Sequence, residues 1–437
     1  MRSIPGDNPE LYEIRNINTF GLGAKSAARH GKNYSRLITP QQNPIESGYR
    51  RLASSAAIAS LFAYAVILCV TPASVNEIAQ YYHASGASLG WLYRMCMLGF
   101  FSTVIAGGHY GDRRGKLPVM VCGSVMMAGG ALLFAWTGSF AGAILAIFIM
   151  GAGGGFAEGA AMAILADLYW GARRTAMLNW AQVVFGIGAV GAPLVVARLL
   201  KTGVDWRMGY TWTSVVCLCS ALLAFAAFKT GNERPVADHQ DSTDGWREIL
   251  SDKLIFWLSV GIMLYVAAEA GQVNWMAAFF KRDLGASAPL AASSVALYWA
   301  GITLGRMAAT RLSRRMADVT LILWFLVAAT FWQVVLLLAK SPAVALVAVP
   351  ALGFFMGPIW PTILSRASAA RPEQSGLLFG IIMSFGCMGA AVFPPFMVKA
   401  SDVVGMRAAL WMCVALLVIN LFIFVALRIR DDTAVGS

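Results

Sequence analysis

The sequence predicts an all-α polytopic membrane protein with twelve transmembrane helices in two six-helix bundles. Three observations predict this fold class. Of the 437 residues, 58% are apolar and 13% are charged, the mean hydropathy is +0.65, and the apolar residues form unbroken runs of roughly 20. A soluble domain carries roughly 25% charged residues, so this composition excludes an ordinary soluble enzyme. A porin-like barrel is excluded as well, because its strands alternate polar and apolar residues.

The apolar runs begin at Leu52, and the rest of the chain provides about 32 residues for each span. This length suits a membrane-crossing helix followed by a short loop. We expect spans at residues 53–80, 88–110, 117–137, 140–167, 174–199, 207–228, 254–280, 289–312, 318–339, 343–366, 375–399 and 407–428.

Two polar segments divide the chain. Residues 1–51 are polar and basic, and we expect a disordered cytoplasmic tail there. Residues 229–253 form the longest polar stretch after that tail, and they separate a bundle at 52–228 from a second bundle at 254–430. Residues 431–437 are expected to form a short cytoplasmic tail.

The charge distribution predicts the orientation. With the N-terminus inside, the cytoplasmic segments carry 24 Lys and Arg residues and the opposite side carries 8. Positive residues favour the cytoplasmic side, so both termini are expected in the cytoplasm of an inner or plasma membrane protein. The net charge of +12 is therefore explained by topology rather than by nucleic-acid binding.

The loop after the second span carries a recognisable motif, G-H-Y-G-D-R-R-G-K. In this loop a glycine permits close helix approach, and an acid at a helix end can pair with an Arg across the turn and close one face. A basic turn follows the eighth span too, so the two bundles resemble a duplicated unit. The chain is similar here to the major facilitator superfamily, whose loop signature is matched by Gly108, Asp112, Arg113, Gly115 and Lys116.

Three acidic residues within the spans are candidate proton-coupling groups: Glu77, Glu158 and Glu269. Carboxylates are costly in hydrocarbon, so each one suggests a function. Glu158 lies deep in the fourth span among small residues, where burial favours the protonated form and allows a proton to load and unload. The structural alternative is an ion pair with Arg94. Glu77 lies near the outer end of the first span, where it is either a coupling group or an interfacial acid.

Candidate substrate-binding residues are amides and aromatics within the spans. Buried amides offer donors and acceptors to a polyhydroxylated ligand, and indole rings offer flat faces for a sugar. Some of these side chains are equally suited to holding helices together or anchoring at the interface. The candidates are Asn76, Asn179, Gln182, Gln272, Asn274, Trp275 and Trp360.

Several short stretches resemble the fucose-galactose-glucose:proton symporter branch of the superfamily. They include V-N-E-I at 75–78, A-E-G-A-A at 157–161 and L-N-W-A-Q at 178–182. The resemblance implies coupling carboxylates at Glu77 and Glu158, and sugar contact at Asn179 and Gln182. The extra carboxylate, Glu269, leaves the coupling ion open between H⁺ and Na⁺.

Taken together, these features predict a monomeric, proton-coupled symporter for a monosaccharide or related solute that works by alternating access. A proton-driven exporter of drugs or metabolites and a non-transporting membrane sensor are the alternatives. No nucleophile and base pair, metal-ligand cluster or phosphate-binding loop is visible in the sequence, so we expect neither an enzyme nor a bound metal or cofactor.

Overall fold

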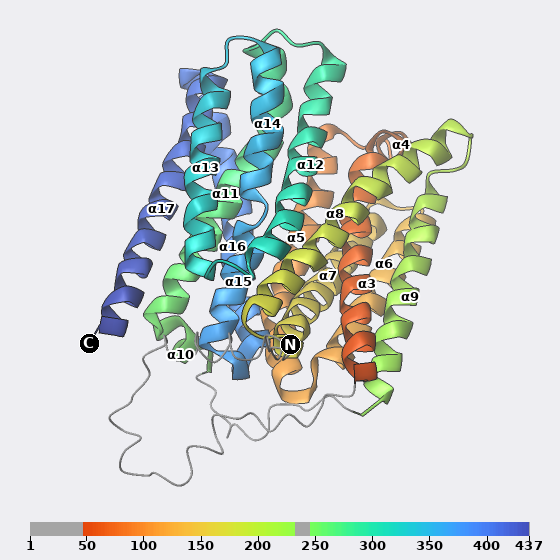
Figure 1. Ribbon diagram of the computed structural model, residues 1–437. Helices are drawn as coiled ribbons and strands as arrows, with labels where there is room; N and C mark the ends of the chain where they lie inside the picture. Colours follow the sequence, from red (N-terminus) through yellow and green to blue (C-terminus); the bar gives the residue numbers. More distant parts are fainter. Residues whose placement is uncertain (1–46, 232–244, 437) are drawn as a thin grey trace, which may run out of the picture.

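Helices account for nearly all of the residues that the computed structural model describes, which are 47–231 and 245–436, and no strand occurs among them (Figure 1). The helices of the first half are α3 (Ser47–Ala73), α4 (Val75–Tyr81), α5 (Gly86–Arg114), α6 (Lys116–Trp136), α7 (Phe140–Leu168), α8 (Gly171–Lys201) and α9 (Arg207–Lys229). Those of the second half are α10 (Gly245–Ser251), α11 (Lys253–Arg282), α12 (Ala288–Leu312), α13 (Asp318–Leu338), α14 (Pro342–Met356), α15 (Ile359–Ala370), η2 (Pro372–Gln374), α16 (Ser375–Val404) and α17 (Met406–Gly436).

Each of the twelve expected spans corresponds to a helix or to an interrupted helix. In the described part of the chain, eleven segments are long and apolar enough to cross a membrane, and α14 with α15 counts as one of them. Helix α12 is not among the eleven, although its 25 residues are long enough. Its sequence contains several hydroxyl side chains and Arg306.

The ends of three predicted segments differ from expectation. The span expected at 53–80 is interrupted at Ser74, two residues after Pro72, where the backbone leaves helical geometry at φ −108° and ψ 14°. Glu77 therefore lies in the first turn of the separate helix α4. Helix α3 begins at Ser47, inside the expected tail 1–51, and α17 continues to Gly436 through the expected tail 431–437. Residues 1–46 of the expected tail lie outside the described part.

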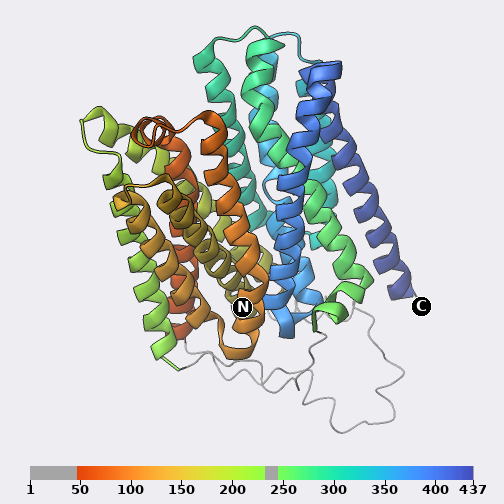
Figure 2. The same cartoon turned by 180° about the vertical axis from the view of Figure 1, so that it is seen from behind.

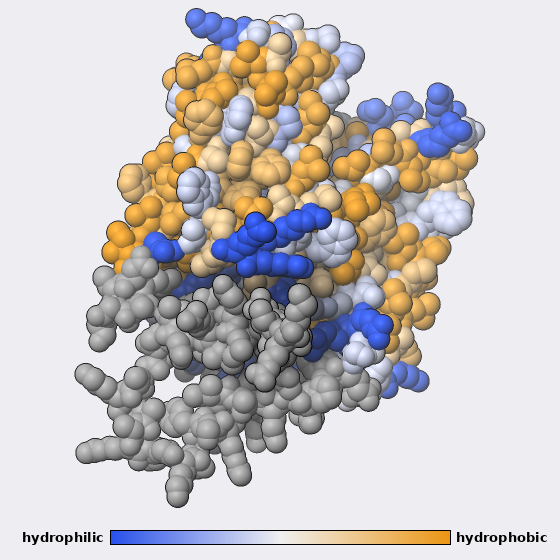
Figure 3. Space-filling view, viewed as in Figure 1, coloured by the Kyte–Doolittle hydropathy of each residue, from blue (hydrophilic) through white to orange (hydrophobic). Residues whose placement is uncertain are grey.

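The helices form two groups, α3 to α9 and α10 to α17, which stand side by side in both views (Figures 1 and 2). Helix α3 begins, and α17 ends, at the same end of the molecule, the lower end in Figure 1. We call it the basic end, because the turns there carry Arg113, Arg114, Arg311, Arg314 and Arg315. Toward the opposite end the two groups diverge, and the space-filling view is hollowed between them there (Figure 3).

Glycines let helices within each half approach closely. On α6, a Cβ at Gly123 would lie 2.6 Å from the carbonyl oxygen of Gly153 and 2.7 Å from the nitrogen of Ala157, both on α7. Such separations leave no room for a methyl group, so the contact between α6 and α7 depends on glycine. Large apolar side chains are instead exposed on outward faces, Leu222 at 67% for example, as expected of lipid-facing helices.

The short helix α10 is attached to the second half by Arg371. Its guanidinium lies 2.7 Å from Glu248 Oε1 on α10 and 3.2 Å from Asp252 Oδ2, which caps α11. The hydrogen bond with Glu248 raises the pKa of Arg371 above its usual range. The described part of the segment expected as a linker, 229–253, is therefore partly helical and anchored at the basic end.

The glycine packing predicts a difference between two substitutions on the same helix. Gly123→Ala should destabilise the protein by about 1–3 kcal/mol, because the added methyl group overlaps the backbone of α7. Gly129→Ala on α6 is the matched control: nothing lies within 4 Å of its Cβ position, so it should leave stability unchanged or slightly raised. Thermal unfolding midpoints of the two purified variants in detergent measure the difference, and equal midpoints would contradict the packing argument.

Candidate functional site

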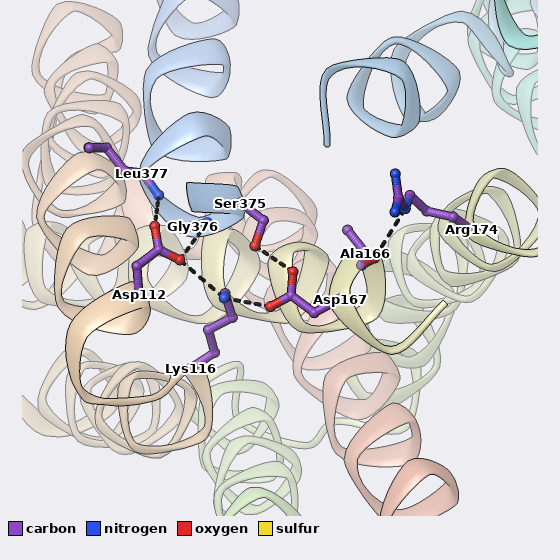
Figure 4. Close-up of polar contacts among 8 residues, drawn as sticks. All are labelled: Asp112, Lys116, Ala166, Asp167, Arg174, Ser375, Gly376 and Leu377. Atoms are coloured by element: carbon purple, nitrogen blue, oxygen red, sulfur yellow. Dashed lines mark hydrogen bonds and ion pairs between the residues drawn. The ribbon is translucent and has the colours of Figure 1, made fainter. Parts of the chain in front are cut away.

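The two halves meet at the basic end, where Asp112 of α5 lies against the start of α16 (Figure 4). Its carboxylate accepts hydrogen bonds from the backbone N–H groups of Gly376 at 2.9 Å and Leu377 at 2.8 Å. These are first-turn N–H groups with no partner inside their own helix, and the helix dipole favours an anion there. A Cβ on Gly108 would overlap the carbonyl oxygen of Gly376, so glycine is required for this approach.

Lys116 links Asp112 to a second acid, Asp167, at the end of α7. Its Nζ lies 3.1 Å from Asp112 Oδ1 and 2.6 Å from Asp167 Oδ2. The hydroxyl of Ser375 donates to Asp167 Oδ1 at 2.6 Å, so this carboxylate too reaches the second half (Figure 4). We call the contact of these groups with the start of α16 the first seam.

The expected pairing of Asp112 with an Arg across the turn is wrong. Arg113 and Arg114 are exposed, whereas Lys116 at position i+4 is buried and reaches the carboxylate. Gly115 makes this geometry possible: its φ of +102° turns the chain sharply between α5 and α6, at a conformation that a side chain would oppose. The rest of the expected motif takes part, because Gly108 supports the contact with α16.

A second seam joins the halves through α8, and the sequence reasoning missed it. Thr175 at the start of α8 donates to Asp318 Oδ1 of α13 at 2.8 Å, and its hydroxyl lies 2.7 Å from that of Ser365 on α15. Thr175 and Ser365 are at most 1% exposed. Two separate contacts therefore close the basic end. The first seam joins α5 and α7 to α16, and the second seam joins α8 to α13 and α15.

Deeper in the bundle, Arg306 of α12 forms the centre of a buried polar cluster. Its side chain is 5% exposed. Its Nη1 donates to the carbonyl oxygen of Gln182 in α8, across the two halves, and its Nε donates to that of Gly357, each at 3.2 Å. Its charge interacts with Glu158 from the first half and with Glu269 from the second half.

Glu158 lies on α7 beside a ring from α3. A Cβ on Gly154, one turn earlier, would overlap the ring of Tyr64, so the small residue lets Tyr64 pack beside the acid. The side-chain amide of Gln182 approaches the carboxylate of Glu158. The alternative ion pair with Arg94 is not formed, because Arg94 is exposed and its guanidinium stacks over the Trp91 ring at 5.0 Å.

Glu269 lies on α11 and accepts a hydrogen bond from the hydroxyl of Tyr265, one turn earlier, at 3.0 Å. The fully buried Tyr298 of α12 also interacts with Glu269. The cluster thus contains two carboxyl groups and one guanidinium, contributed by both halves.

Several expected binding residues have buried polar atoms without a hydrogen-bond partner. Asn179 donates to the carbonyl oxygen of Thr175 at 2.9 Å, but its Oδ1 accepts nothing. Neither polar atom of the Gln272 amide is satisfied, and the same is true of Trp275 Nε1 and the hydroxyl of Tyr298. Buried polar groups are normally paired, so these atoms indicate a place for a polar ligand or water.

Other predicted residues lie apart from this cluster. Asn76 is exposed and Glu77 half-buried on α4, beyond the end of α3. Asn274 is exposed while Gln272, two residues earlier, is 1% exposed, so they occupy different faces of α11. Trp360 is half-buried and packs against the apolar core. Among the described residues, no three His, Cys, Asp or Glu side chains are grouped to hold a metal ion.

Comparison with known proteins gives the following matches. A sequence model of the Major Facilitator Superfamily matches residues 56–394. Protein TsgA of Escherichia coli O157:H7 (strain EC4115 / EHEC) is 23% identical over 337 residues, which are 76% of this chain and 84% of that protein. A crystal structure of the transporter FucP in the outward conformation superposes with a TM-score of 0.75 at 18% identity, covering 86% of this chain and 98% of FucP. The proton:xylose symporter XylE, bound to 6-bromo-6-deoxy-D-glucose, gives a TM-score of 0.69 at 16% identity, covering 86% and 95%.

The first seam predicts that Asp112→Asn destabilises the protein by about 3 kcal/mol, because it breaks a buried ion pair and points an amide toward backbone donors. Asp205→Asn is the matched control. Its ion pair with Arg207 is exposed, so the loss should stay below about 1 kcal/mol. The measurement is the thermal unfolding midpoint of each purified variant in detergent. Equal midpoints for Asp112→Asn and Asp205→Asn would show that Asp112 does not hold the halves together.

Proposed function

The chain belongs to the Major Facilitator Superfamily of transporters, and we propose that it is a symporter that couples uptake of a monosaccharide or similar polyol to proton entry. The observation that carries this proposal is the presence of two half-buried carboxyl groups, Glu158 and Glu269, that interact electrostatically with the buried guanidinium of Arg306 between the halves. Ionisable groups in the interior of a transporter are costly and mark ion pathways. Glu158 is the proposed proton carrier.

Unpaired amide and hydroxyl atoms support a polyhydroxylated substrate. Asn179 comes from the first half, and Gln272, Trp275 and Tyr298 come from the second half. A neutral solute with several hydroxyl groups can donate to an amide oxygen and accept from an indole N–H at the same time. The structural similarity to a proton:xylose symporter agrees with this substrate class.

The proposed cycle begins from the arrangement observed. We place the basic end in the cytoplasm, because positive loops favour that side, so the hollow between the halves faces outward. A proton binds Glu158, the solute binds between the halves, and the seams at the basic end then open. Glu77, on α4 near the outer opening, is proposed as a secondary group that assists proton entry.

The proposal predicts that Glu158→Gln abolishes uphill accumulation of the substrate but retains counterflow of preloaded substrate. The neutral amide removes the exchangeable proton and preserves size and polarity. Accumulation and counterflow in proteoliposomes measure the two activities. Glu77→Gln serves as the comparison, and it should slow uptake and leave accumulation intact. Persistent accumulation by Glu158→Gln would exclude Glu158 as the coupling site.

The substrate class is tested by the pH outside proteoliposomes as hexoses, deoxyhexoses and polyols are added one at a time. Alkalinisation by one sugar identifies both the substrate and proton symport. If none of these solutes changes the external pH although the protein is folded, the proposal is contradicted and export of another solute is favoured. Sugar uptake that requires Na⁺ and causes no pH change would contradict proton coupling but not symport of the sugar.

A further inference from the structure

Arg306 is a buried cation that forms no ion pair. It is 5% exposed, and its two hydrogen bonds, each 3.2 Å long, go to the neutral carbonyl oxygens of Gly357 and Gln182. In the part of the chain that the structure describes, no carboxylate oxygen lies within 4.0 Å of its guanidinium. The half-buried Arg371, by contrast, has one carboxylate at 2.7 Å and another at 3.2 Å. Since buried charges in proteins are normally paired, the surroundings of Arg306 lack an anion.

The guanidinium of Arg306 is held in place but not saturated. In a regular helix the carbonyl oxygen of Gly357 would accept from the residue four positions later, but that residue is Pro361, which has no N–H. This oxygen accepts from Arg306 Nε instead, and the Gln182 carbonyl oxygen accepts from Nη1. A guanidinium has five N–H donors in one plane, so three remain, and Nη2 makes no hydrogen bond with any described residue. Such a donor set matches the two oxygens of a carboxylate.

Space for a solute adjoins this guanidinium. Glu158 is half-buried although Ala157 and Gly159 on either side of it are buried, and Glu269 of the opposite half is half-buried as well. The charge of Arg306 interacts with both acids over a longer range than an ion pair. In the proposed cycle Glu158 is protonated when the solute binds, so it then offsets no positive charge. A carboxylate on the solute would supply the negative charge at that step.

Unpaired atoms in the second half indicate that this anion also carries hydroxyl groups. Both polar atoms of the Gln272 amide, the indole N–H of Trp275 and the hydroxyl of Tyr298 are buried without a hydrogen-bond partner. Gln272 and Trp275 are three positions apart on α11 and therefore share a face, and Tyr298 is on α12, the helix that carries Arg306. A fully ionised inorganic anion has no donor for the amide oxygen, whereas a hydroxyl group both donates and accepts.

We propose that the transported solute is a sugar acid, a polyhydroxylated chain or ring with one carboxylate, and that Arg306 binds this carboxylate. Arg306 is then a substrate-binding residue that selects for negative charge, while the unpaired amide, indole and hydroxyl groups contact the rest of the solute. The inference rests on the proposed symport, and it narrows the substrate class to those sugar-like solutes that carry a carboxylate.

The test compares solutes that differ only in the carboxylate. Galacturonate is paired with galactose, glucuronate with glucose, and gluconate with glucitol, because each acid has a carboxylate where its partner has a hydroxymethyl group. Binding is measured as the rise of the thermal unfolding midpoint of the full chain in detergent, at constant ionic strength, over a series of solute concentrations. At least one acid should raise the midpoint, and its neutral partner should raise it less at equal concentration.

Substitutions of Arg306 test its role in this preference. Arg306→Gln should increase the dissociation constant of the acid by at least about tenfold, because charge-assisted hydrogen bonds are lost, and should remove the preference over the neutral partner. Arg306→Lys retains the charge but not the planar fork, so the shift caused by the acid should be reduced, and this variant decides the matter if Arg306→Gln does not fold. Arg207→Gln is the matched control. It removes a guanidinium that is already paired with Asp205, so the shift should stay as in the unchanged protein.

The inference is overturned if no acid is preferred over its neutral partner, or if Arg306→Gln binds the acid as tightly as the unchanged protein. Its failure can be told from failure of the proposed symport. Uptake of a neutral hexose with external alkalinisation, together with no preference for an acid, would retain proton symport and reject the sugar acid. A preference for an acid that depends on Arg306, with uptake of that acid and no pH change, would retain the anion site and reject proton coupling.

Discussion

A guanidinium in the membrane interior is stable only where carboxylates and carbonyl groups replace its water, and Arg306 meets that condition with groups from both halves of the molecule. This requirement constrains much of the surrounding structure. The interruption at Gly357 provides one carbonyl oxygen, the close approach of α8 provides another, and Glu158 and Glu269 provide the compensating charge. Any motion that separates the halves must therefore take from Arg306 the carbonyl oxygen and the carboxyl group that the first half supplies.

The same helix that supplies a carbonyl oxygen to Arg306 also closes the basic end. Thr175, Asn179, Gln182 and Gly186 recur at helical spacing along α8, and so they form one stripe. Thr175 contacts the second seam, the Gln182 carbonyl oxygen accepts from Arg306, and Gly186 lies against Thr303. Residues expected to bind substrate are thus part of the surface along which the halves separate.

Hydropathy predicted the helices well because length and apolar composition alone decide what crosses a bilayer. It failed locally at Ser74, where the backbone leaves helical geometry within an apolar run and separates Glu77 from the first span. The sequence also marked Glu158, Asn179 and Gln182 as polar residues in apolar surroundings, and all three are in or beside the central cluster. It missed Arg306 as a partner, although a single Arg in a span was a usable signal, because pairing across helices depends on tertiary packing.

The second seam could not be read from the sequence for a similar reason. Thr175, Asp318 and Ser365 are unremarkable residues near helix ends, and their 143- and 190-residue separations give no local pattern. By contrast, the first seam includes a motif with turn-forming glycines and charges at fixed spacing. Its acid, Asp112, was predicted, but the expected Arg partner was wrong, because Lys116 and the backbone N–H groups at the start of α16 occupy the carboxylate instead.

The position of the α8 stripe couples the affinity for a solute to the separation of the two halves. A solute held by Asn179 from one half and by Gln272 or Trp275 from the other would bridge the surfaces that move apart. It stabilises the arrangement in which both sets of groups are near, and opening of the basic end removes one set. By linkage, the free energy that the solute contributes to holding the halves together equals the affinity it loses when they separate. In the proposed cycle, release toward the basic end would therefore need no separate device, since the opening that exposes the site also separates the groups that bind the solute.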